Sequence, residues 1–276
     1  MKWGFCSDMT IDFQVLQTQP FPERLSWEMV DRWAEMPVFS ENDPSNPEWT
    51  PTPVRELDLG HRYGIVKVKD ESDRRSNPTG TIKDRPAWEY ATLYRDLARK
   101  VHLNHSALAR SAVSFLNVPR FSTITAGNAG LALSHRFREF GLPPIKLLVD
   151  NNLADDTKEN LMGLYADIYS TDFTRRLSPE DIKEATGNAG GVDLTQMMYM
   201  EPQAVFYDWH VHESFNEEPD MIFIPYGSGR LFENYLTWQR RNQTSPDPRL
   251  RVTNLKKLSK ISILGAKPEG SQSIAD

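Results

Sequence analysis

The chain has 276 residues, of which 39% are hydrophobic and 25% are charged, and its formal net charge is −6. This composition is that of a globular protein with a substantial core, so it excludes a largely disordered chain. The negative balance argues against capture of nucleic acid through its phosphates, and a small-molecule partner is expected instead.

Cysteine content and the lengths of the apolar segments indicate in which cellular compartment the protein resides. The one cysteine, Cys6, excludes an intrachain disulfide and fits a reducing environment. Residues 1–13 lack the apolar core of a signal peptide, and no window approaches the roughly 18 apolar residues that a membrane span needs. We therefore expect a cytoplasmic protein with no membrane partner.

Residues 1–59 read as an irregular arm, broken up by prolines and interrupted by one short helical pattern. In that pattern Trp27, Val30, Trp33 and Ala34 recur at helical spacing. We expect this arm to pack on the C-terminal part of the chain.

From residue 65 onward, strand and helix patterns alternate, which favours parallel sheets in an α/β fold. We predict two three-layer α/β/α subdomains, residues 60–187 and 188–276, with mostly parallel sheets and a cofactor cleft between them. The expected strands are 65–68, 121–126, 145–150, 167–171, 220–227 and 260–268, and the expected helices are 87–101, 129–140, 155–166 and one that begins near Leu231.

Three loops follow expected strands and lead into expected helices, which is where open α/β sheets bind ligands. They are "NPTGTIKDR" (77–85), "TAGNAG" (125–130) and "PYGSGRL" (225–231). In the last of them, glycines around a serine let backbone N–H groups converge on a phosphate at a helix start. Taken alone, the same residues also fit a plain turn.

The other two loops carry side chains suited to chemistry. Asn128 can orient a polar ring substituent or a carboxylate, although it also suits the cap of the following helix. Lys83 stands beside Ile82 at a helix start, where partial desolvation would make its amine competent for imine chemistry. The alternative is a surface lysine that forms salt bridges only.

His210 and His212 have the i, i+2 spacing of one strand face, which two metal ligands can share. No third ligand stands at a diagnostic spacing, so we interpret them as ordinary polar residues of a strand or loop and predict no metal site.

Taken in order, the three loops resemble the fold-type II pyridoxal-phosphate enzymes, the tryptophan synthase β-like superfamily. This family includes threonine synthase, cysteine synthase and serine/threonine dehydratases. "KDESDRRSNPTGTIKDR" (69–85) resembles its lysine motif and is closest to threonine synthase, which typically has Ser-Phe in place of Thr81-Ile82. "TAGNAGLAL" (125–133) resembles its substrate-carboxylate loop, and "IPYGSGRL" (224–231) resembles its phosphate loop. The resemblance runs from residue 51 to residue 276.

The resemblance implies a pyridoxal-phosphate-dependent lyase or transferase that performs β- or γ-elimination or replacement on an amino acid. Lys83 would bind the cofactor aldehyde covalently and later move the α-proton, while Asn128 would hydrogen-bond the ring hydroxyl. The implied phosphate site comprises Gly227, Ser228, Gly229, Arg230 and Leu231, and the implied substrate loop comprises Thr125, Ala126, Gly127, Asn128 and Ala129.

The sequence departs from the family pattern in three places. Family chains continue beyond the counterpart of Asp276 and supply there a residue that faces the pyridine nitrogen. Lys267 stands where an acidic residue is common, and Arg230 replaces a small residue. These departures suggest a fragment of a longer enzyme, or a homodimer or partner segment that completes the C-terminal subdomain. The alternative function is a catalytically silent pyridoxal-phosphate-binding or interaction protein.

Overall fold

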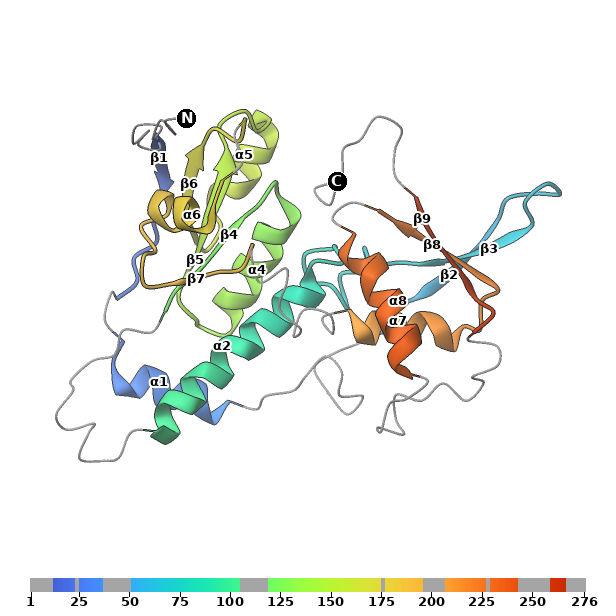
Figure 1. Ribbon diagram of the computed structural model, residues 1–276, viewed down its shortest axis with the longest axis horizontal. Helices are drawn as coiled ribbons and strands as arrows, with labels where there is room; N and C mark the ends of the chain where they lie inside the picture. The colour runs from blue at the N-terminus through green and yellow to red at the C-terminus, as the bar shows by residue number, and fades with distance from the viewer. Residues whose placement is uncertain are drawn as a thin grey trace, which may run out of the picture. The chain divides into compact units, whose positions relative to one another are not determined.

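The chain forms two compact units, each built from two separate stretches of sequence (Figure 1). Unit 1 comprises residues 1–38 and 90–198, and unit 2 comprises residues 39–89 and 199–276. The computed structural model describes residues 12–22, 25–36, 51–104, 119–174, 177–195, 207–226, 229–242 and 259–266.

A five-stranded sheet lies at the centre of unit 1, in the order β1-β6-β5-β4-β7. Strands β6, β5, β4 and β7 run parallel, and β1 pairs antiparallel with β6 at one edge. The first five residues of β5 are buried, as expected for a parallel strand that is covered on both faces. The strands are β1 (Phe13–Gln17), β4 (Phe121–Ile124), β5 (Ile145–Asp150), β6 (Ala166–Thr171) and β7 (Val192–Asp193).

Aromatic side chains form part of the core of unit 1. The Tyr94 ring meets the rings of Trp33, Phe121 and Phe137 edge-on, with centroid distances of 5.8, 5.1 and 5.9 Å. All four side chains are buried. The helices of this unit are α1 (Trp27–Glu35), α4 (Asn128–Glu139), α5 (Asp155–Leu161) and α6 (Pro179–Ala185).

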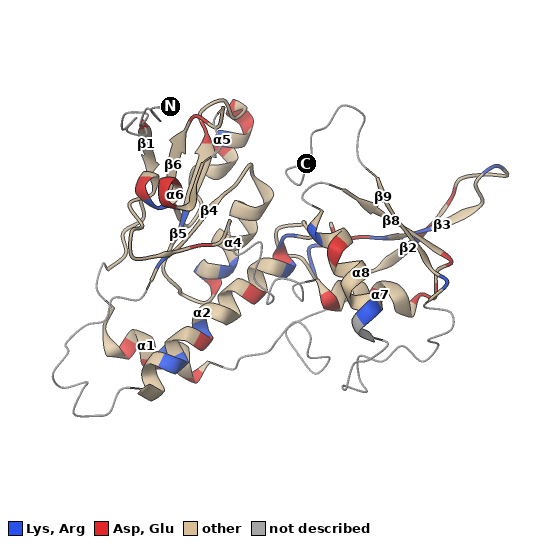
Figure 2. Cartoon of the chain, viewed as in Figure 1, with Lys and Arg blue, Asp and Glu red and all other residues tan. Residues whose placement is uncertain are grey.

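The starts of the short helices carry the local signals that helix termini favour. Ser178 and Asp181 form a capping box at α6, each side chain accepting a backbone hydrogen bond from the other residue. Acidic residues occupy the first turns of α5 and α6, where they complement the helix dipole (Figure 2). The longest helix, α2 (Asp84–Asn104), begins in unit 2 and continues into unit 1.

The described residues of unit 2 form two pairs of strands and two further helices. Strands β2 (Val54–Asp58) and β3 (Ile65–Lys69) pair antiparallel, whereas β8 (Met221–Pro225) and β9 (Ser262–Ala266) pair parallel. Helices α7 (Asp208–Asn216) and α8 (Arg230–Asn242) complete the described part. Its core includes Val211, Phe215, Ile224, Tyr235, Trp238 and Ile261.

The predicted α/β class is confirmed, as are the strands and helices expected from residue 65 onward, with bounds that differ by a few residues. One interpretation is wrong: His210 and His212 lie on helix α7 and not on a strand or loop. The sequence did not predict β1, β2, α6 or β7.

The described part of the arm expected at residues 1–59 divides between the two units: β1 and α1 belong to unit 1, whereas residues 51–59 belong to unit 2 together with residues 199–276. Strand β1 pairs with β6, and the Trp33 indole donates to the Gly141 carbonyl at 3.2 Å, so both contacts lie within unit 1 and not in the C-terminal part. The reason is that the edge of β6 offers unpaired backbone groups that an added strand satisfies. The boundaries at 59/60 and 187/188 stay a prediction.

None of the helices in the described ranges combines the length and apolar character that crossing a membrane requires.

Candidate functional site

The loop between β3 and α2 carries Lys83 and is held by its own hydrogen bonds. Gly80 has a φ of 72°, a left-handed conformation that glycine adopts without strain. The Thr81 hydroxyl accepts from the backbone N–H of Lys83 at 3.0 Å. The backbone N–H and hydroxyl of Thr79 donate to Asp84 Oδ2 at 3.0 and 2.7 Å. Lys83 is thereby fixed immediately before the first residue of α2.

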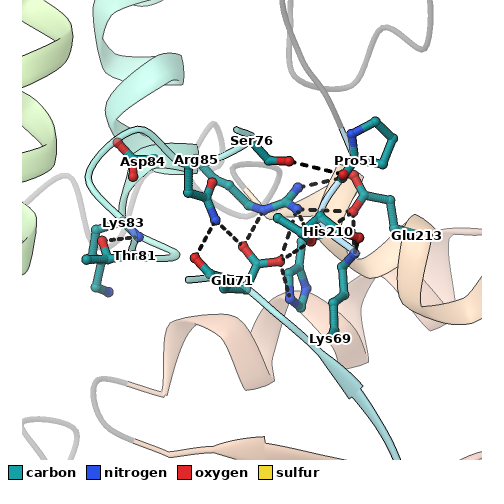
Figure 3. A network of polar contacts seen from close by, with 12 residues as sticks. Pro51, Lys69, Glu71, Ser76, Thr81, Lys83, Asp84, Arg85, His210 and Glu213 are labelled. Atoms are coloured by element: carbon teal, nitrogen blue, oxygen red, sulfur yellow. Dashed lines mark hydrogen bonds and ion pairs between the residues drawn. The ribbon is translucent and has the colours of Figure 1, made fainter. Parts of the chain in front are cut away.

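The Lys83 side chain lines a cavity of about 1020 Å³ within unit 2. Its amine donates to the Tyr207 hydroxyl at 3.3 Å. In Figure 3 the Lys83 side chain points away from Glu71 and Glu213, toward which the Arg85 side chain points. The same cavity is lined by Gly229, Arg230 and Leu231, together with apolar side chains of β3 and β8. One space therefore brings together an amine, a guanidinium and a helix start.

The described end of the expected phosphate loop, between β8 and α8, is Gly229 and the start of α8. Gly229 has a φ of 75°, and its carbonyl accepts the first helical hydrogen bond, from Glu233 N at 2.9 Å. A Cβ on Gly229 would lie only 3.0 Å from the Tyr226 hydroxyl, so the close approach requires glycine. Gly227 and Ser228 lie outside the described residues.

The substrate loop expected at residues 125–129 belongs to unit 1. The Thr125 hydroxyl accepts from the backbone N–H groups of Gly127 and Gly130 at 3.1 and 2.9 Å, which folds the loop tightly before α4. The cap of α4 is Gly127, so Asn128 does not serve as the N-cap residue. Asn128 and Ala126 are exposed, and Ala129 is partly exposed. This leaves the Asn128 amide available to a ligand.

A buried polar network in unit 2 fixes the first turn of α2. The Arg85 side chain is fully buried and pairs with both oxygens of Glu71, at 2.9 and 3.1 Å (Figure 3). It also donates to Glu213 at 3.1 Å and to the Thr52 hydroxyl at 3.1 Å. The Lys69 ammonium forms a further ion pair with Glu213. Arg85 follows Lys83 by two residues, so this network also anchors the lysine loop.

His210 joins this network from helix α7. Its Nε2 lies 3.4 Å from Glu71 Oε1, and its Nδ1 lies 3.1 Å from the Tyr235 hydroxyl. Burial lowers the pKa of His210 to about 3, against the opposing attraction of Glu71. Burial alone would raise the pKa of Glu71, but the charges of His210, when protonated, and of Arg85 outweigh it and lower that pKa. At neutral pH His210 is neutral, so Arg85 is the cation that balances Glu71.

Solved structures of pyridoxal-phosphate enzymes share this fold. Diaminopropionate ammonia lyase from Escherichia coli superposes with a TM-score of 0.54 at 16% identity, over 96% of this chain and 70% of that chain. The O-acetylserine-dependent cystathionine β-synthase from Helicobacter pylori gives 0.53 at 19% identity, over 87% and 70% of the two chains. O-Ureido-L-serine synthase gives 0.52 at 15% identity, over 81% and 62%. The chain has the fold of fold-type II pyridoxal-phosphate enzymes.

This fold-type II likeness is structural, since identities below 20% establish the fold and leave the activity to the site. No family model matches the sequence, and no curated protein matches it. The chain spans between 62% and 70% of the length of these three solved chains.

Sequence reasoning missed two residues that line the cavity with Lys83. Tyr207, the partner of the Lys83 amine, lies 124 residues away along the chain and belongs to no recognisable motif. Glu71 lies within the quoted lysine motif, but its spacing from Arg85 does not reveal their pairing. In the described residues no group of three or more His, Cys, Asp or Glu side chains could hold a metal ion.

The buried His210 predicts a pH dependence of folding. Its native pKa of about 3 lies below its unfolded value near 6.5, so the unfolded chain binds more protons between these values. The free energy of unfolding should therefore decrease as the pH is lowered. This one group should account for a loss of about 2 kcal/mol from pH 7 to pH 5. Glu71, whose native pKa is lowered, adds to the loss only below the ordinary glutamate pKa of 4.5.

Urea denaturation at pH 7 and at pH 5 tests this dependence. The His210→Gln variant keeps hydrogen-bonding capacity but cannot titrate, so the difference between the two pH values should shrink relative to the wild type. An identical difference in both proteins would contradict the assignment.

Proposed function

We propose that this chain is a pyridoxal-phosphate-dependent enzyme that performs elimination or replacement on an amino acid. The observation that carries the proposal is the shared cavity of unit 2, in which the Lys83 amine lies with Gly229, Arg230 and Leu231. The cavity offers an amine for an aldehyde, and a guanidinium and helix N-terminus for a phosphate.

The chain's own residues divide the work as follows. Lys83 would hold the cofactor aldehyde and exchange the α-proton, and the phosphate would be held by the backbone N–H groups of residues 227–231 with reinforcement from Arg230. Asn128 orients the ring hydroxyl, and residues 125–129 bind the substrate carboxylate. When bound, the cofactor supplies the electron sink for bonds at the α-carbon of the amino acid.

The finer reaction type that we propose is threonine synthase-like or cysteine synthase-like, on the basis of the lysine motif. The neighbours in structure are lyases, synthases and a racemase, so the catalytically silent alternative gains no support from them. A phosphorylated hydroxy-amino acid should release inorganic phosphate if the threonine synthase-like reading holds, whereas O-acetylserine should release acetate if the cysteine synthase-like reading holds. The cytoplasmic location and the homodimer or partner segment stay predictions.

Borohydride trapping tests the proposal directly. The Lys83 amine should condense with the aldehyde of added pyridoxal phosphate, releasing one water, and borohydride should reduce the resulting C=N bond to a stable secondary amine. Peptide mass spectrometry should then locate the adduct at Lys83. Pyridoxal, which lacks the phosphate, serves as the control and should be trapped there far less. An adduct spread over surface lysines, or equal trapping of both aldehydes, would overturn the proposal.

A further inference from the structure

The Tyr207 hydroxyl is the hydrogen-bond partner of the Lys83 amine. The two polar atoms lie 3.3 Å apart, and the amine lies 5.9 Å from the centroid of the Tyr207 ring. Tyr207 is only 5% exposed, and both residues line the same cavity. The hydroxyl is therefore part of the cavity wall, at the point where the amine enters.

Helices α7 and α8 hold Tyr207 in place. Its backbone N–H donates to Asn234 Oδ1 at 3.1 Å, and Asn234 Nδ2 donates to Asp208 Oδ1 at 2.5 Å. Asn234 is 1% exposed and Asp208 is 2% exposed, so these hydrogen bonds form where water does not compete. The position of the hydroxyl is therefore set by the packing of α8 against the start of α7.

The backbone of Lys83 is fixed as well, through the Thr81 hydroxyl. Between this fixed backbone and the fixed Tyr207 hydroxyl lie the flexible methylenes of the lysine, which carry much rotamer freedom. One hydrogen bond at the tip selects among these rotamers. A phenol also accepts from an ammonium and donates to a free amine, so the contact survives a change of protonation state.

We propose that Tyr207 is a positioning residue for Lys83, whose hydroxyl holds the amine at the cavity wall in the orientation that meets an aldehyde anchored by its phosphate. This inference rests on the proposed function, because it assigns Tyr207 a role in the first covalent step at Lys83. Tyr207 acts through the lysine and needs no contact with the cofactor.

The variant Tyr207→Phe tests this role, since it removes the hydroxyl and keeps the ring. The rate at which borohydride traps pyridoxal phosphate at Lys83 should fall on the order of 10-fold, because the amine loses its orientation toward an anchored aldehyde. A second reagent, trinitrobenzenesulfonate, labels amines without a phosphate anchor. Its rate of labelling at Lys83, measured by peptide mass spectrometry, should stay close to that of the wild type.

The matched control is Tyr235→Phe, which removes a buried hydroxyl from the same unit. Tyr235 lines the same cavity, and its hydroxyl donates to Ser214 at 2.6 Å and lies 3.1 Å from His210, whereas the Lys83 amine donates to Tyr207. Trapping at Lys83 should be unchanged in this control. A Tyr207→Phe protein that traps like the wild type, or one that loses both reactions in parallel, would overturn the inference. If the wild type itself traps nothing at Lys83, the proposed function fails and the inference fails with it.

Discussion

Replacing Lys83 with alanine is expected to abolish covalent capture of pyridoxal phosphate. The Lys83 amine lines the cavity of unit 2 together with Gly229 and Arg230, and it can condense with an aldehyde that binds there. The visible absorbance of the bound cofactor and the borohydride-trapped peptide should both disappear, while the thermal midpoint stays near that of the wild type. The side chain is only partly buried and makes its hydrogen bond to Tyr207, so its loss leaves no buried charge behind.

Lys67→Ala is the matched control for this variant. Lys67 lines the same cavity but forms an exposed ion pair with Glu217 at 2.8 Å. Its removal should leave trapping at Lys83 intact, which separates a specific amine from general lysine reactivity. Capture that persists in Lys83→Ala, or that depends equally on Lys67, would contradict the assignment.

Replacing Arg85 with alanine is expected to destabilise the protein by about 3–5 kcal/mol, the usual cost of breaking a buried ion pair from one side. The fully buried guanidinium bridges Glu71 and Glu213. Without it, the largely buried carboxylates of Glu71 and Glu213 lose their shared cation. The Lys69 ammonium still pairs with Glu213. Urea denaturation followed by tryptophan fluorescence measures the change in the free energy of unfolding.

Arg75→Ala provides the contrast for Arg85→Ala. The Arg75 side chain is 80% exposed and pairs with Asp73, so solvent screens that pair and its loss should barely move the urea midpoint. Equal effects of the two variants would refute the idea that burial of Arg85 holds the start of α2. In Arg85→Ala, trapping at Lys83 should weaken as well, because the lysine loop loses its anchor.

The lysine loop was predictable because its chemistry is local. The positive φ of Gly80, the hydrogen bond from the Lys83 N–H to the Thr81 hydroxyl and the start of α2 all depend on residues within the quoted motif. The same holds for Gly229, whose place before α8 follows from the glycine-rich sequence. By contrast, the contact of Lys83 with Tyr207 depends on packing between segments far apart in sequence, and no local pattern encodes it.

The error at His210 shows how a short pattern misleads. Spacing of i, i+2 suggested a strand, but Val211 and Phe215 are buried at i, i+4, which is the signal of a helix face. Nine residues are too few for the two periods to separate clearly when polar and aromatic side chains are mixed. Strand β1 escaped prediction for a different reason, since its partner β6 lies about 150 residues further along the chain.

The pairing of β8 with β9 has a practical consequence for biochemical work. In the described residues this sheet has only two strands, and Met221, Phe223 and Leu264 are 48, 66 and 43% exposed on it. Met221 and Phe223 also line the cavity of unit 2, and exposed apolar side chains of this kind favour association between molecules. Sample handling should therefore favour dilute solutions or a solubilising fusion partner, because concentrating the protein will promote association through this face before the active-site chemistry can be measured.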